Sequence, residues 1–302
     1  FQALPGTLHF LASTCDVPAQ RMERLLRALV ELRMVEPPGD GARKWRLTER
    51  GELLTEEHPW TLADAALEYG RDLTKFWCEL PQRLRDPEES EPDIFNEVVQ
   101  SPRRCQRHHR MLRSYARHDY VELPRILDSV GLGATMEPVV LDVGGGTGTL
   151  AKLILEHLQK SHPEVQVLVL DLPEVLAQIE PSAGLWLCEG DLRSEWTVPA
   201  VPSMVVMARV LHDFHDSAAL EILSNAFQTL KPGGHLIIVE FVLQDDGGSS
   251  GGLCDLHLLA VTGGRERTAK ELHLLVEAAG FVNLEWHDMV SLPSVLAAEK
   301  PT

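Results

Sequence analysis

The chain has 302 residues, with 28 Lys and Arg against 45 Asp and Glu and a formal net charge of −17. Such an acidic balance argues against non-specific attraction to nucleic-acid phosphates or anionic membranes. Hydrophobic residues make up 44% of the chain and charged residues 24%, which argues against extended disorder and a collagen-like structure. The length predicts about two domains of ~100–200 residues each.

The cysteines, the histidines and the lengths of the apolar runs argue against further classes of protein. Five cysteines are scattered without a Cys-x-x-Cys pair, which argues against a disulfide framework or a zinc site and predicts a reducing, cytoplasmic location. No apolar run approaches the ~20 residues of a membrane helix, and no signal-peptide pattern opens the chain. The thirteen histidines show no metal-ligand spacing such as His-Glu-x-x-His, so we predict no metal.

The first sixty residues predict short helices followed by a small hairpin. Residues 18–34 predict an amphipathic helix, because apolar side chains recur at i, i+3, i+4 and i+7, namely Met22, Leu25, Leu26 and Leu29. Gly39 to Gly41 then supply a tight turn before an extended piece at residues 45–47. This order resembles a winged helix, which serves either DNA binding or packing and dimerisation. Residues 1–60 hold eight Lys and Arg against nine Asp and Glu, so the second role is favoured.

The hydrophobic pattern of the rest of the chain changes near Gly133. Before it, we predict a helical, connective region with a loop at Asp86–Pro92 and an amphipathic helix over Arg110–Leu127. After it, apolar runs alternate with helical stretches, which is typical of central parallel strands joined by crossover helices. The sequence therefore predicts an α/β, Rossmann-like, doubly wound sheet, with a flexible loop at 247–252. The predicted strands are Val139–Val143, Val165–Leu170, Leu185–Cys188, Met204–Ala208 and His235–Val239.

A glycine-rich turn, Gly144-Gly145-Gly146-Thr147-Gly148, follows the first strand of this predicted sheet. A strand, a glycine turn and a helix start form a nucleotide cradle, because glycines let backbone N–H groups approach a ligand closely. The dinucleotide fingerprint G-x-G-x-x-G needs glycine where Thr149 stands, and a P-loop needs a Gly-Lys-Ser/Thr that does not follow. Taken alone, the turn is also consistent with a simple strand–helix connection.

Acidic side chains follow the ends of later predicted strands. Asp171 closes the second strand, where a carboxylate can accept two hydrogen bonds from a ribose diol, and Asp191 follows the third, where it can accept from an exocyclic amine. Glu240 closes the strand after the turn Pro232-Gly233-Gly234. Open α/β sheets bind ligands at the carboxyl ends of their strands. Each acid alone is equally a solvated strand-end residue, but together they favour a nucleoside site.

Six motifs occur in one order: LDVGGGTGTLA, LVLDLPEV, CEGDL, ARVLHDFHD, LKPGGHLIIVEFVL and GGRERT. In this order they resemble the S-adenosylmethionine-dependent O-methyltransferase family of acetylserotonin and plant phenolic methyltransferases, to which many bacterial natural-product enzymes also belong. The resemblance covers nearly the whole chain. It implies a homodimer, with a winged-helix-like dimerisation domain over residues 1–105 and a class I catalytic domain over residues 106–302. Further N-terminal helices that interlock two protomers in the family are expected to be absent or truncated before Phe1.

The resemblance also implies a site for S-adenosylmethionine, with S-adenosylhomocysteine as the product. The glycine turn would back the methionine part, Asp171 would bind the ribose hydroxyls, and Asp191 would hold the adenine. Arg209 resembles an arginine of the acetylserotonin branch that reaches the cofactor, whereas plant enzymes place a lysine one residue earlier, at Ala208 here. The implied cofactor-binding residues are Asp142, Gly144, Gly146, Asp171, Leu172, Asp191, Leu192 and Arg209.

Methyl transfer to a hydroxyl needs a group that removes the acceptor's proton. A phenol has a pKa of ~10 and is mostly protonated at neutral pH, so a base poised near pH 7 contributes typically ~10²–10⁴-fold. The resemblance places this general base on His212, with Glu240 and Glu266 as its flanking acids. Asp213 is implied as a second orienting group or a substrate contact. From the residues alone, Asp213 or Asp216 is equally a helix cap, and Glu266 equally a member of a surface ion pair.

The lining of the acceptor site is also implied by the resemblance. His257 stands where the acetylserotonin branch has asparagine, which argues against an indole-amide substrate. Met111, Tyr115 and His118 lie on a predicted helix whose family equivalent contributes methionines and aromatics to the pocket. Such a stripe is equally typical of a hydrophobic core.

Two alternatives stay open beside the methylation of a small phenolic or enolic molecule. Relatives of this fold have diverged to hydroxylation, decarboxylation or pericyclic chemistry with the cofactor retained, although His212, Glu240 and Glu266 together favour methyl transfer. The non-enzymatic alternative is a DNA-binding regulator that uses the winged helix, against which the net charge of −17 weighs. We therefore predict a methyltransferase with a small-molecule partner and neither a nucleic-acid nor a membrane partner.

Overall fold

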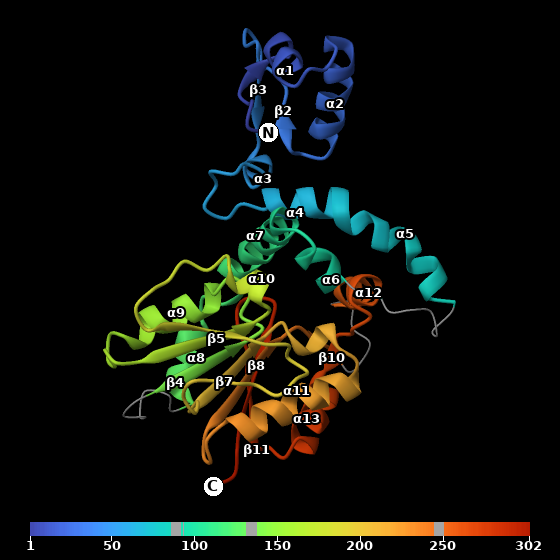
Figure 1. Ribbon diagram of the computed structural model, residues 1–302. Coiled ribbons are helices and arrows are strands. Elements are labelled where there is room, and N and C mark those ends of the chain that lie inside the picture. The colour runs from blue at the N-terminus through green and yellow to red at the C-terminus, as the bar shows by residue number, and fades with distance from the viewer. Residues whose placement is uncertain (86–91, 93, 131–137, 245–250) are drawn as a thin grey trace. The chain divides into compact units, whose positions relative to one another are not determined.

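The computed structural model describes residues 1–85, 92, 94–130, 138–244 and 251–302 of the chain, in two compact units (Figure 1). These are Phe1–Gly70 and Arg71–Thr302. Residues 105 and 106, where the sequence places a domain boundary, lie inside helix α7 (Pro102–Asp119), and the roles of the two domains stay predictions. Among the described residues, no helix combines the length and the apolar character needed to cross a membrane.

The first unit consists of short helices and a small antiparallel sheet. Its elements are β1 (Gly6–Thr7), α1 (Leu8–Thr14), α2 (Ala19–Glu31), β2 (Val35–Glu36), β3 (Lys44–Leu47), α3 (Glu49–Glu52) and α4 (Ala63–Glu68). Helix α2 and the β2–β3 hairpin confirm the predicted helix and turn, and β1 joins them in the order β1-β3-β2. Met22 and Leu26 of α2 are buried against Leu11 of α1.

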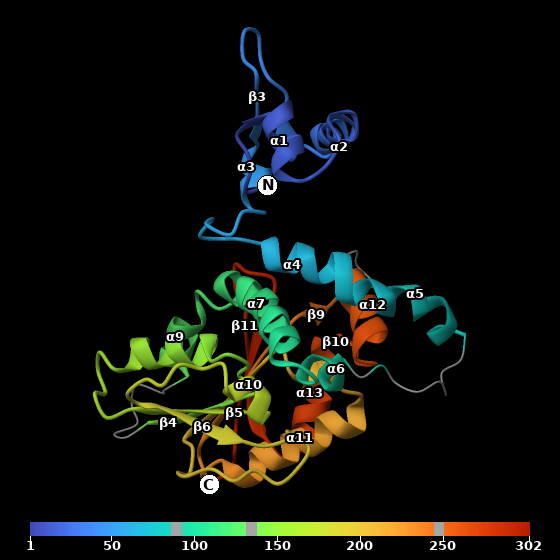
Figure 2. The ribbon, with the colours of Figure 1, turned by 45° about the horizontal axis from the view of Figure 1, so that its top comes forward.

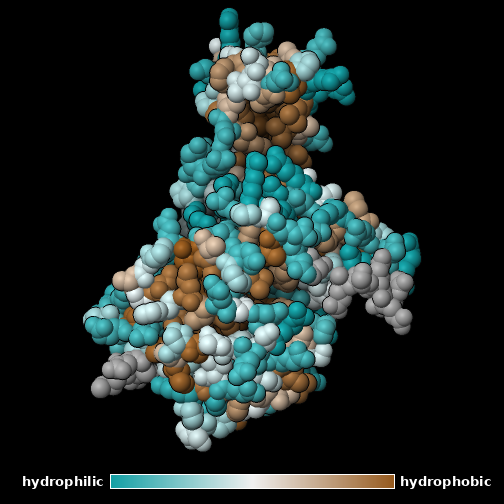
Figure 3. Space-filling model, in the orientation of Figure 1, coloured by the Kyte–Doolittle hydropathy of each residue, from teal (hydrophilic) through white to brown (hydrophobic). Residues whose placement is uncertain are grey.

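Part of the predicted apolar stripe of α2 faces outward. Leu25 is 51% exposed. On the same unit, Phe10 is 53% exposed and Leu32 is 59% exposed. Figure 3 shows hydrophobic residues among the hydrophilic ones on the surface of this unit. The first unit therefore leaves large apolar side chains in contact with solvent, in addition to those that form its own core.

The second unit is organised around one sheet of seven strands. The strands lie in the order β11-β12-β8-β7-β4-β5-β6. Their bounds are β4 (Val139–Val143), β5 (Gln166–Asp171), β6 (Leu185–Glu189), β7 (Met204–Ala208), β8 (His235–Glu240), β11 (Val282–His287) and β12 (Ser294–Glu299). The five predicted strands are confirmed, and they run parallel to one another. The structure adds β11 and β12, which pair antiparallel at one edge and make the sheet mixed.

Alternate residues of the central strands enter two separate cores. On β4, Leu141 and Val143 pack with helices α11 (Asp216–Thr229) and α13 (Ala269–Ala278), whereas Val140 packs with α8 (Leu123–Ser129) and α9 (Thr149–Leu158). This alternation follows from the two-residue period of a strand, and it explains why the strands are apolar throughout. The sheet is thus covered on both faces by helices, as an α/β fold requires.

Further helices and short strands of the second unit surround this sheet, among them α6, α7, α10 and α12 (Figure 2). The further elements are α5 (Thr74–Arg83), α6 (Ile94–Val99), α7, α10 (Pro173–Leu176), η3 (Leu211–Asp213), β9 (Val242–Leu243), α12 (Gly252–Val261) and β10 (Arg267–Thr268), and η1 (Tyr69–Leu73) begins in the first unit and ends in the second. The prediction of one helix over Arg110–Leu127 was wrong: α7 ends at Asp119, and a new helix begins at Leu123. Pro124 causes this break, because proline suits the first turn of a helix and disrupts its interior. Loops were predicted at residues 86–92 and 247–252, and most of these residues lie outside the part of the chain that the structure describes.

Candidate active site

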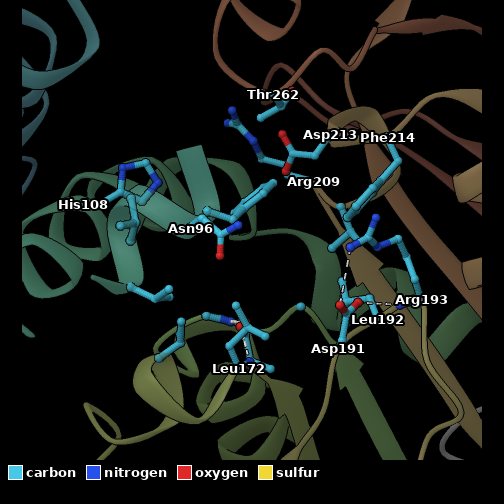
Figure 4. A pocket seen from close by; sticks show the side chains of 18 of the residues that line it. Asn96, His108, Leu172, Asp191, Leu192, Arg193, Arg209, Asp213, Phe214 and Thr262 are labelled. Carbon is cyan, nitrogen blue, oxygen red and sulfur yellow. Dashed lines mark hydrogen bonds and ion pairs between the residues drawn. The ribbon is translucent and has the colours of Figure 1, made fainter. Parts of the chain in front are cut away.

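A pocket of about 400 Å³ lies at the carboxyl ends of the parallel strands (Figure 4). The turns after β4, β5, β6 and β7 form one wall, and residues of α6 and α7 face them. The volume lies within the range of small-molecule sites. The pocket is where the strand order reverses between β4 and β7, the place at which open α/β sheets bind their ligands.

The glycine turn after β4 is held in a conformation that favours glycine. Gly144, Gly146 and Gly148 all have positive φ, at 66°, 57° and 72°. A β-carbon on Gly144 would lie 2.8 Å from the side chain of Val210, so the turn also has no space for a larger residue. These contacts support a backbone cradle rather than a flexible loop, and Gly144 and Gly146 both line the pocket.

Asp142 lies beneath this turn and not in the pocket. Its side chain is buried, and its Oδ2 makes no hydrogen bond within the described part of the chain. Burial, together with the nearby charge of Asp171, raises its pKa to about 8. A β-carbon on Gly145 would lie 2.6 Å from Oδ2. Asp142 therefore supports the cradle from below, and its predicted contact with the cofactor stays a prediction.

The two other predicted acids line the pocket. Asp171 accepts hydrogen bonds from the backbone N–H groups of Gly146 at 2.8 Å and Leu172 at 2.7 Å. Burial raises its pKa to about 6, although both bonds favour the charged form. Asp191, after β6, accepts from the N–H of Arg193 at 2.9 Å. Since β4, β5 and β6 are neighbours in the sheet, the turn, Asp171 and Asp191 lie in that order along its edge.

His212 lies on η3, directly after β7, in a buried cluster of charged groups. Its Nδ1 is 3.3 Å from Oε1 of Glu266 and 3.4 Å from Oε2 of Glu240, and its Nε2 is 3.9 Å from Oδ2 of Asp213. The exposed fractions of His212, Glu240 and Glu266 are 5%, 4% and 3%. Glu266 is therefore not a surface ion pair, and the structure brings together the four residues that the sequence placed in the catalytic group.

The loop before Glu266 closes tightly on η3. The N–H of Arg265 donates to the carbonyl of His212 at 2.8 Å. A β-carbon on Gly264 would lie 2.1 Å from the same carbonyl oxygen, so only glycine lets the two backbones approach this closely. On the other side, Oε1 of Glu240 accepts from the N–H groups of Val210 and Leu211. These backbone contacts fix the positions of both acids beside the imidazole.

The charges of this cluster favour the protonated imidazole. Burial lowers the pKa of His212, but the opposing charges of Glu240, Asp213 and Glu266 outweigh it and raise the pKa to about 9. The pKa values of Asp213 and Glu240 are raised by burial, against the lowering effect of His212. At neutral pH, the ligand-free cluster therefore holds an imidazolium between carboxyl groups.

Within this cluster, Asp213 lines the pocket, while His212, Glu240 and Glu266 lie behind it. The latter three also form a group in which one ligand atom from each lies within 4.8 Å of the others. A histidine and two carboxylates are a donor set that divalent metals accept. In this structure, however, both carboxylates face the same imidazole Nδ1. The prediction of no metal stays a prediction.

Arg209 lines the pocket from the end of β7 and has an unusual backbone. Its φ is 57°, a conformation that non-glycine residues rarely adopt. Its side chain makes a 2.9 Å ion pair with Asp119 at the end of α7, and its guanidinium lies 5.6 Å from the centre of the Tyr115 ring. Arg209 therefore connects the pocket end of the sheet to α7.

The four residues predicted to line the acceptor site, Met111, Tyr115, His118 and His257, do not line the pocket. Met111 is buried on α7, and Tyr115 lies against Arg209. His257 on α12 stacks on Trp77 of α5, with 5.9 Å between ring centres, and its Nδ1 lies 3.1 Å from the indole nitrogen. Burial, together with the charge of Arg209, lowers the pKa of His257 to about 4. Their contact with substrate stays a prediction.

The pocket also contains residues that the sequence did not identify. From α6 and α7 come Phe95, Asn96, His108, His109 and Leu112. The helical period of α7 could have identified His108, His109 and Leu112 as residues of one helix face. Phe214 lines the pocket as well and stacks on Phe95, with 6.3 Å between ring centres. The helix cap predicted at Asp213 or Asp216 was wrong: His215 caps α11, because its Nδ1 accepts from the N–H of Ala218.

Comparison with known families and proteins gives a consistent result. Residues 91–282 match the O-methyltransferase domain. The chain is 30% identical over 285 residues to 3-amino-4-hydroxybenzoate 4-O-methyltransferase of Streptomyces cremeus, with 90% of this chain and 74% of that enzyme covered. It is also 30% identical over 171 residues to acetylserotonin O-methyltransferase of Homo sapiens, with 54% of this chain and 48% of that enzyme covered. For the human enzyme, the match therefore spans about half its length.

Solved structures share the whole fold. Human N-acetylserotonin methyltransferase in complex with SAM superposes with a TM-score of 0.83 at 25% identity, over 99% of this chain and 88% of that chain. An O-methyltransferase from neocarzinostatin biosynthesis, in complex with SAM and 2-hydroxy-5-methyl naphthoic acid, gives a TM-score of 0.78 at 25% identity, over 98% of this chain and 90% of that chain. This chain belongs to the O-methyltransferase domain family.

Proposed function

We propose that the chain transfers the methyl group of S-adenosylmethionine to a hydroxyl of a small phenolic or enolic molecule, with His212 as the general base. The observation that carries this proposal is the His212 cluster. It lies directly behind Asp213, at the edge where Asp171, Asp191 and the glycine turn line one pocket. Relatives in the family methylate hydroxybenzoate and naphthoic acid compounds or are bound to them, which supports a phenolic acceptor.

The residues of the pocket fit the proposed cofactor. The Asp171 carboxylate already accepts two backbone hydrogen bonds and retains acceptor capacity for a ribose diol. Asp191 lies one strand further along and would accept a hydrogen bond from the adenine amine. On the opposite side of Asp171, Gly144 and Gly146 line the pocket with their backbone alone. The methionyl part would therefore lie over the turn after β4.

The chain's own residues then act on the acceptor. When bound, S-adenosylmethionine supplies a methyl group on a positively charged sulfur, which needs no further activation. Glu266 accepts from Nδ1 of His212 and the charge of Glu240 lies 3.4 Å from the same atom, so the proton stays on Nδ1 and the other nitrogen, Nε2, removes the acceptor's proton. Asp213 lies 3.9 Å from Nε2 and lines the pocket, where it orients the acceptor hydroxyl. The two carboxylates stabilise the imidazolium that forms, as their effect on the pKa of His212 indicates.

The pH dependence of activity follows from the pKa of His212. With a pKa of about 9 in the free protein, the imidazole is mostly protonated at pH 7 and gains its basic form as the pH rises. This pKa would be lower in the complex, because a bound positive charge disfavours the imidazolium. At saturating S-adenosylmethionine, kcat/KM for a phenol is therefore expected to rise with pH between about 6.5 and 9. A flat or falling profile in steady-state assays over this range would contradict His212 as the base.

Isotope transfer tests the proposed reaction directly. S-adenosylmethionine with a labelled methyl group is incubated with a panel of phenols and enols, and the products are identified by mass spectrometry. A labelled methyl ether, formed with an equal amount of S-adenosylhomocysteine, supports the proposal. Cofactor binding with altered acceptors but no methyl ether would instead indicate the hydroxylation, decarboxylation or pericyclic alternative. Absence of cofactor binding would contradict the proposal altogether.

We propose further that residues 1–70 mediate a homodimer. The exposed side chains of Phe10, Leu25 and Leu32 support this, because apolar surface of this kind marks interaction sites. A dimer mass in light scattering at micromolar concentration is the expected result. The double variant Leu25→Asp, Leu32→Asp is expected to shift the mass to that of a monomer, since two charges oppose burial of this face. A monomeric wild-type chain would contradict the proposal.

A further inference from the structure

His109 on α7 is a buried histidine whose tautomer the structure determines. It is 8% exposed, and its Nδ1 lies 2.9 Å from the backbone carbonyl oxygen of Cys105. A carbonyl oxygen only accepts hydrogen bonds, so Nδ1 must carry the proton. Burial lowers the pKa of His109 to about 4, so the ring is neutral at physiological pH. In this neutral tautomer, Nε2 has a lone pair and no proton.

The Nε2 side of the ring faces the glycine turn. A β-carbon on Gly146 would lie 3.6 Å from Cδ2 of His109, the ring carbon bonded to Nε2. The His108 ring packs against His109 nearly at a right angle, with 5.7 Å between ring centres. His109 lines the pocket, and within the part of the chain that the structure describes Nε2 has no hydrogen-bond partner. The ring edge that carries Nε2 thus lies beside the turn after β4.

The proposed function places the methionyl tail of the cofactor at this turn. Asp191 after β6 and Asp171 after β5 take the adenine and the ribose, so the tail extends towards β4, the next strand in the sheet. The tail carries an ammonium group and a carboxylate. A neutral imidazole nitrogen with a lone pair can accept from the ammonium, but it has nothing to donate to the carboxylate.

We infer that Nε2 of His109 accepts a hydrogen bond from the α-ammonium of the cofactor's methionyl tail. This inference rests on the proposed function, and it identifies the residue that recognises the ammonium group of the cofactor. Cys105 positions the ring through its carbonyl, and the amide Nε2 of Gln178 donates to the Cys105 Sγ at 2.9 Å. The ring orientation is therefore fixed before the ligand binds, which reduces the ordering needed on binding.

A cycle of variants and ligands tests this contact. S-adenosylhomocysteine and its analogue with hydrogen in place of the α-ammonium are titrated by calorimetry into the wild type, His109→Phe, His109→Gln and His273→Phe. The last is a matched control, because His273 is a histidine of α13 that lies outside the pocket lining. For His109→Phe, the Kd of S-adenosylhomocysteine is expected to rise about 10- to 100-fold, since the lost hydrogen bond is charge-assisted. The Kd of the analogue is expected to stay within about twofold, because it lacks the donor.

The other variants and outcomes separate the explanations. His109→Gln, which retains an acceptor, is expected to recover part of the affinity, and His273→Phe to behave as wild type. Equal losses for both ligands in His109→Phe would indicate a structural role and overturn the inference, as would no loss for either. If the wild type binds the two ligands equally, the ammonium is not recognised and the inference fails while the proposed function stands. If the wild type binds neither, the proposed function fails with it.

Discussion

Replacing His212 by Gln is expected to lower kcat for a phenol by a factor of about 10²–10⁴ and to change the Kd of S-adenosylhomocysteine by less than about twofold. The imidazole is nearly buried, with Nδ1 hydrogen-bonded to Glu266 and in charge contact with Glu240, so the substitution removes Nε2, the nitrogen that lies 3.9 Å from Asp213 of the pocket lining. Cofactor affinity should be unaffected, because His212 itself does not line the pocket. Single-turnover kinetics and calorimetry measure the two quantities separately.

His273→Gln is the matched control for this prediction. His273 lies on the surface of α13, where it makes a 3.4 Å contact with Glu277. Its loss is expected to leave kcat unchanged. A variant at His212 that keeps more than half of the wild-type kcat would exclude it as the base. A large loss of S-adenosylhomocysteine affinity would indicate that the substitution had disturbed the site as a whole.

Asp171→Asn is expected to raise the Kd of S-adenosylhomocysteine about 10- to 100-fold, because hydrogen bonds to a charged acceptor contribute ~1.5–3 kcal/mol. Asparagine keeps the size of the side chain but has a single acceptor oxygen, so it retains only one of the two hydrogen bonds from the N–H groups of Gly146 and Leu172. The pKa of about 6 adds a second signature. As the pH falls below this value, the wild-type carboxyl protonates and affinity should decrease, whereas the variant should lack this dependence.

Glu189→Gln provides the comparison for Asp171→Asn. Glu189 ends β6 and pairs in register with Asp171, but its side chain is exposed and lies outside the pocket lining. Both changes remove one negative charge from a strand end, so a general electrostatic effect would weaken binding in both variants. The expected result is a loss in Asp171→Asn alone. Similar effects in the two variants would contradict the assignment of Asp171 to the ribose.

The parallel strands could be predicted because burial on both faces makes their sequences apolar throughout. The runs at Val139–Val143 and Met204–Ala208 coincide with β4 and β7. Strand β11 of the antiparallel edge could not be predicted in this way. Strand β11, Val282–His287, has exposed and partly buried side chains, and its pairing depends on contacts with β12. Patterns of hydrophobicity identify a strand only where the fold buries it.

The residues of the site that lie at the ends of strands could be predicted from the sequence. Asp171 and Asp191 were expected in one place because parallel strands end at one edge, and both line the pocket. Contacts between distant segments could not be derived from spacing alone. The pair His212–Glu266 joins residues 54 positions apart, and it depends on the close packing of Gly264 against η3. The orientation of His109 likewise depends on a tertiary arrangement of α7 against the glycine turn.

Phenols of different acidity test most directly whether His212 removes the proton of the acceptor. The ratio of kcat/KM between the wild type and His212→Gln is measured, at one pH, for a series of phenols of similar size and decreasing pKa. A phenol that is already ionised needs no base, so the ratio is predicted to fall from a large value towards one as the acceptor pKa drops below the assay pH. A ratio that stays constant across the series would show that His212 does not remove the proton.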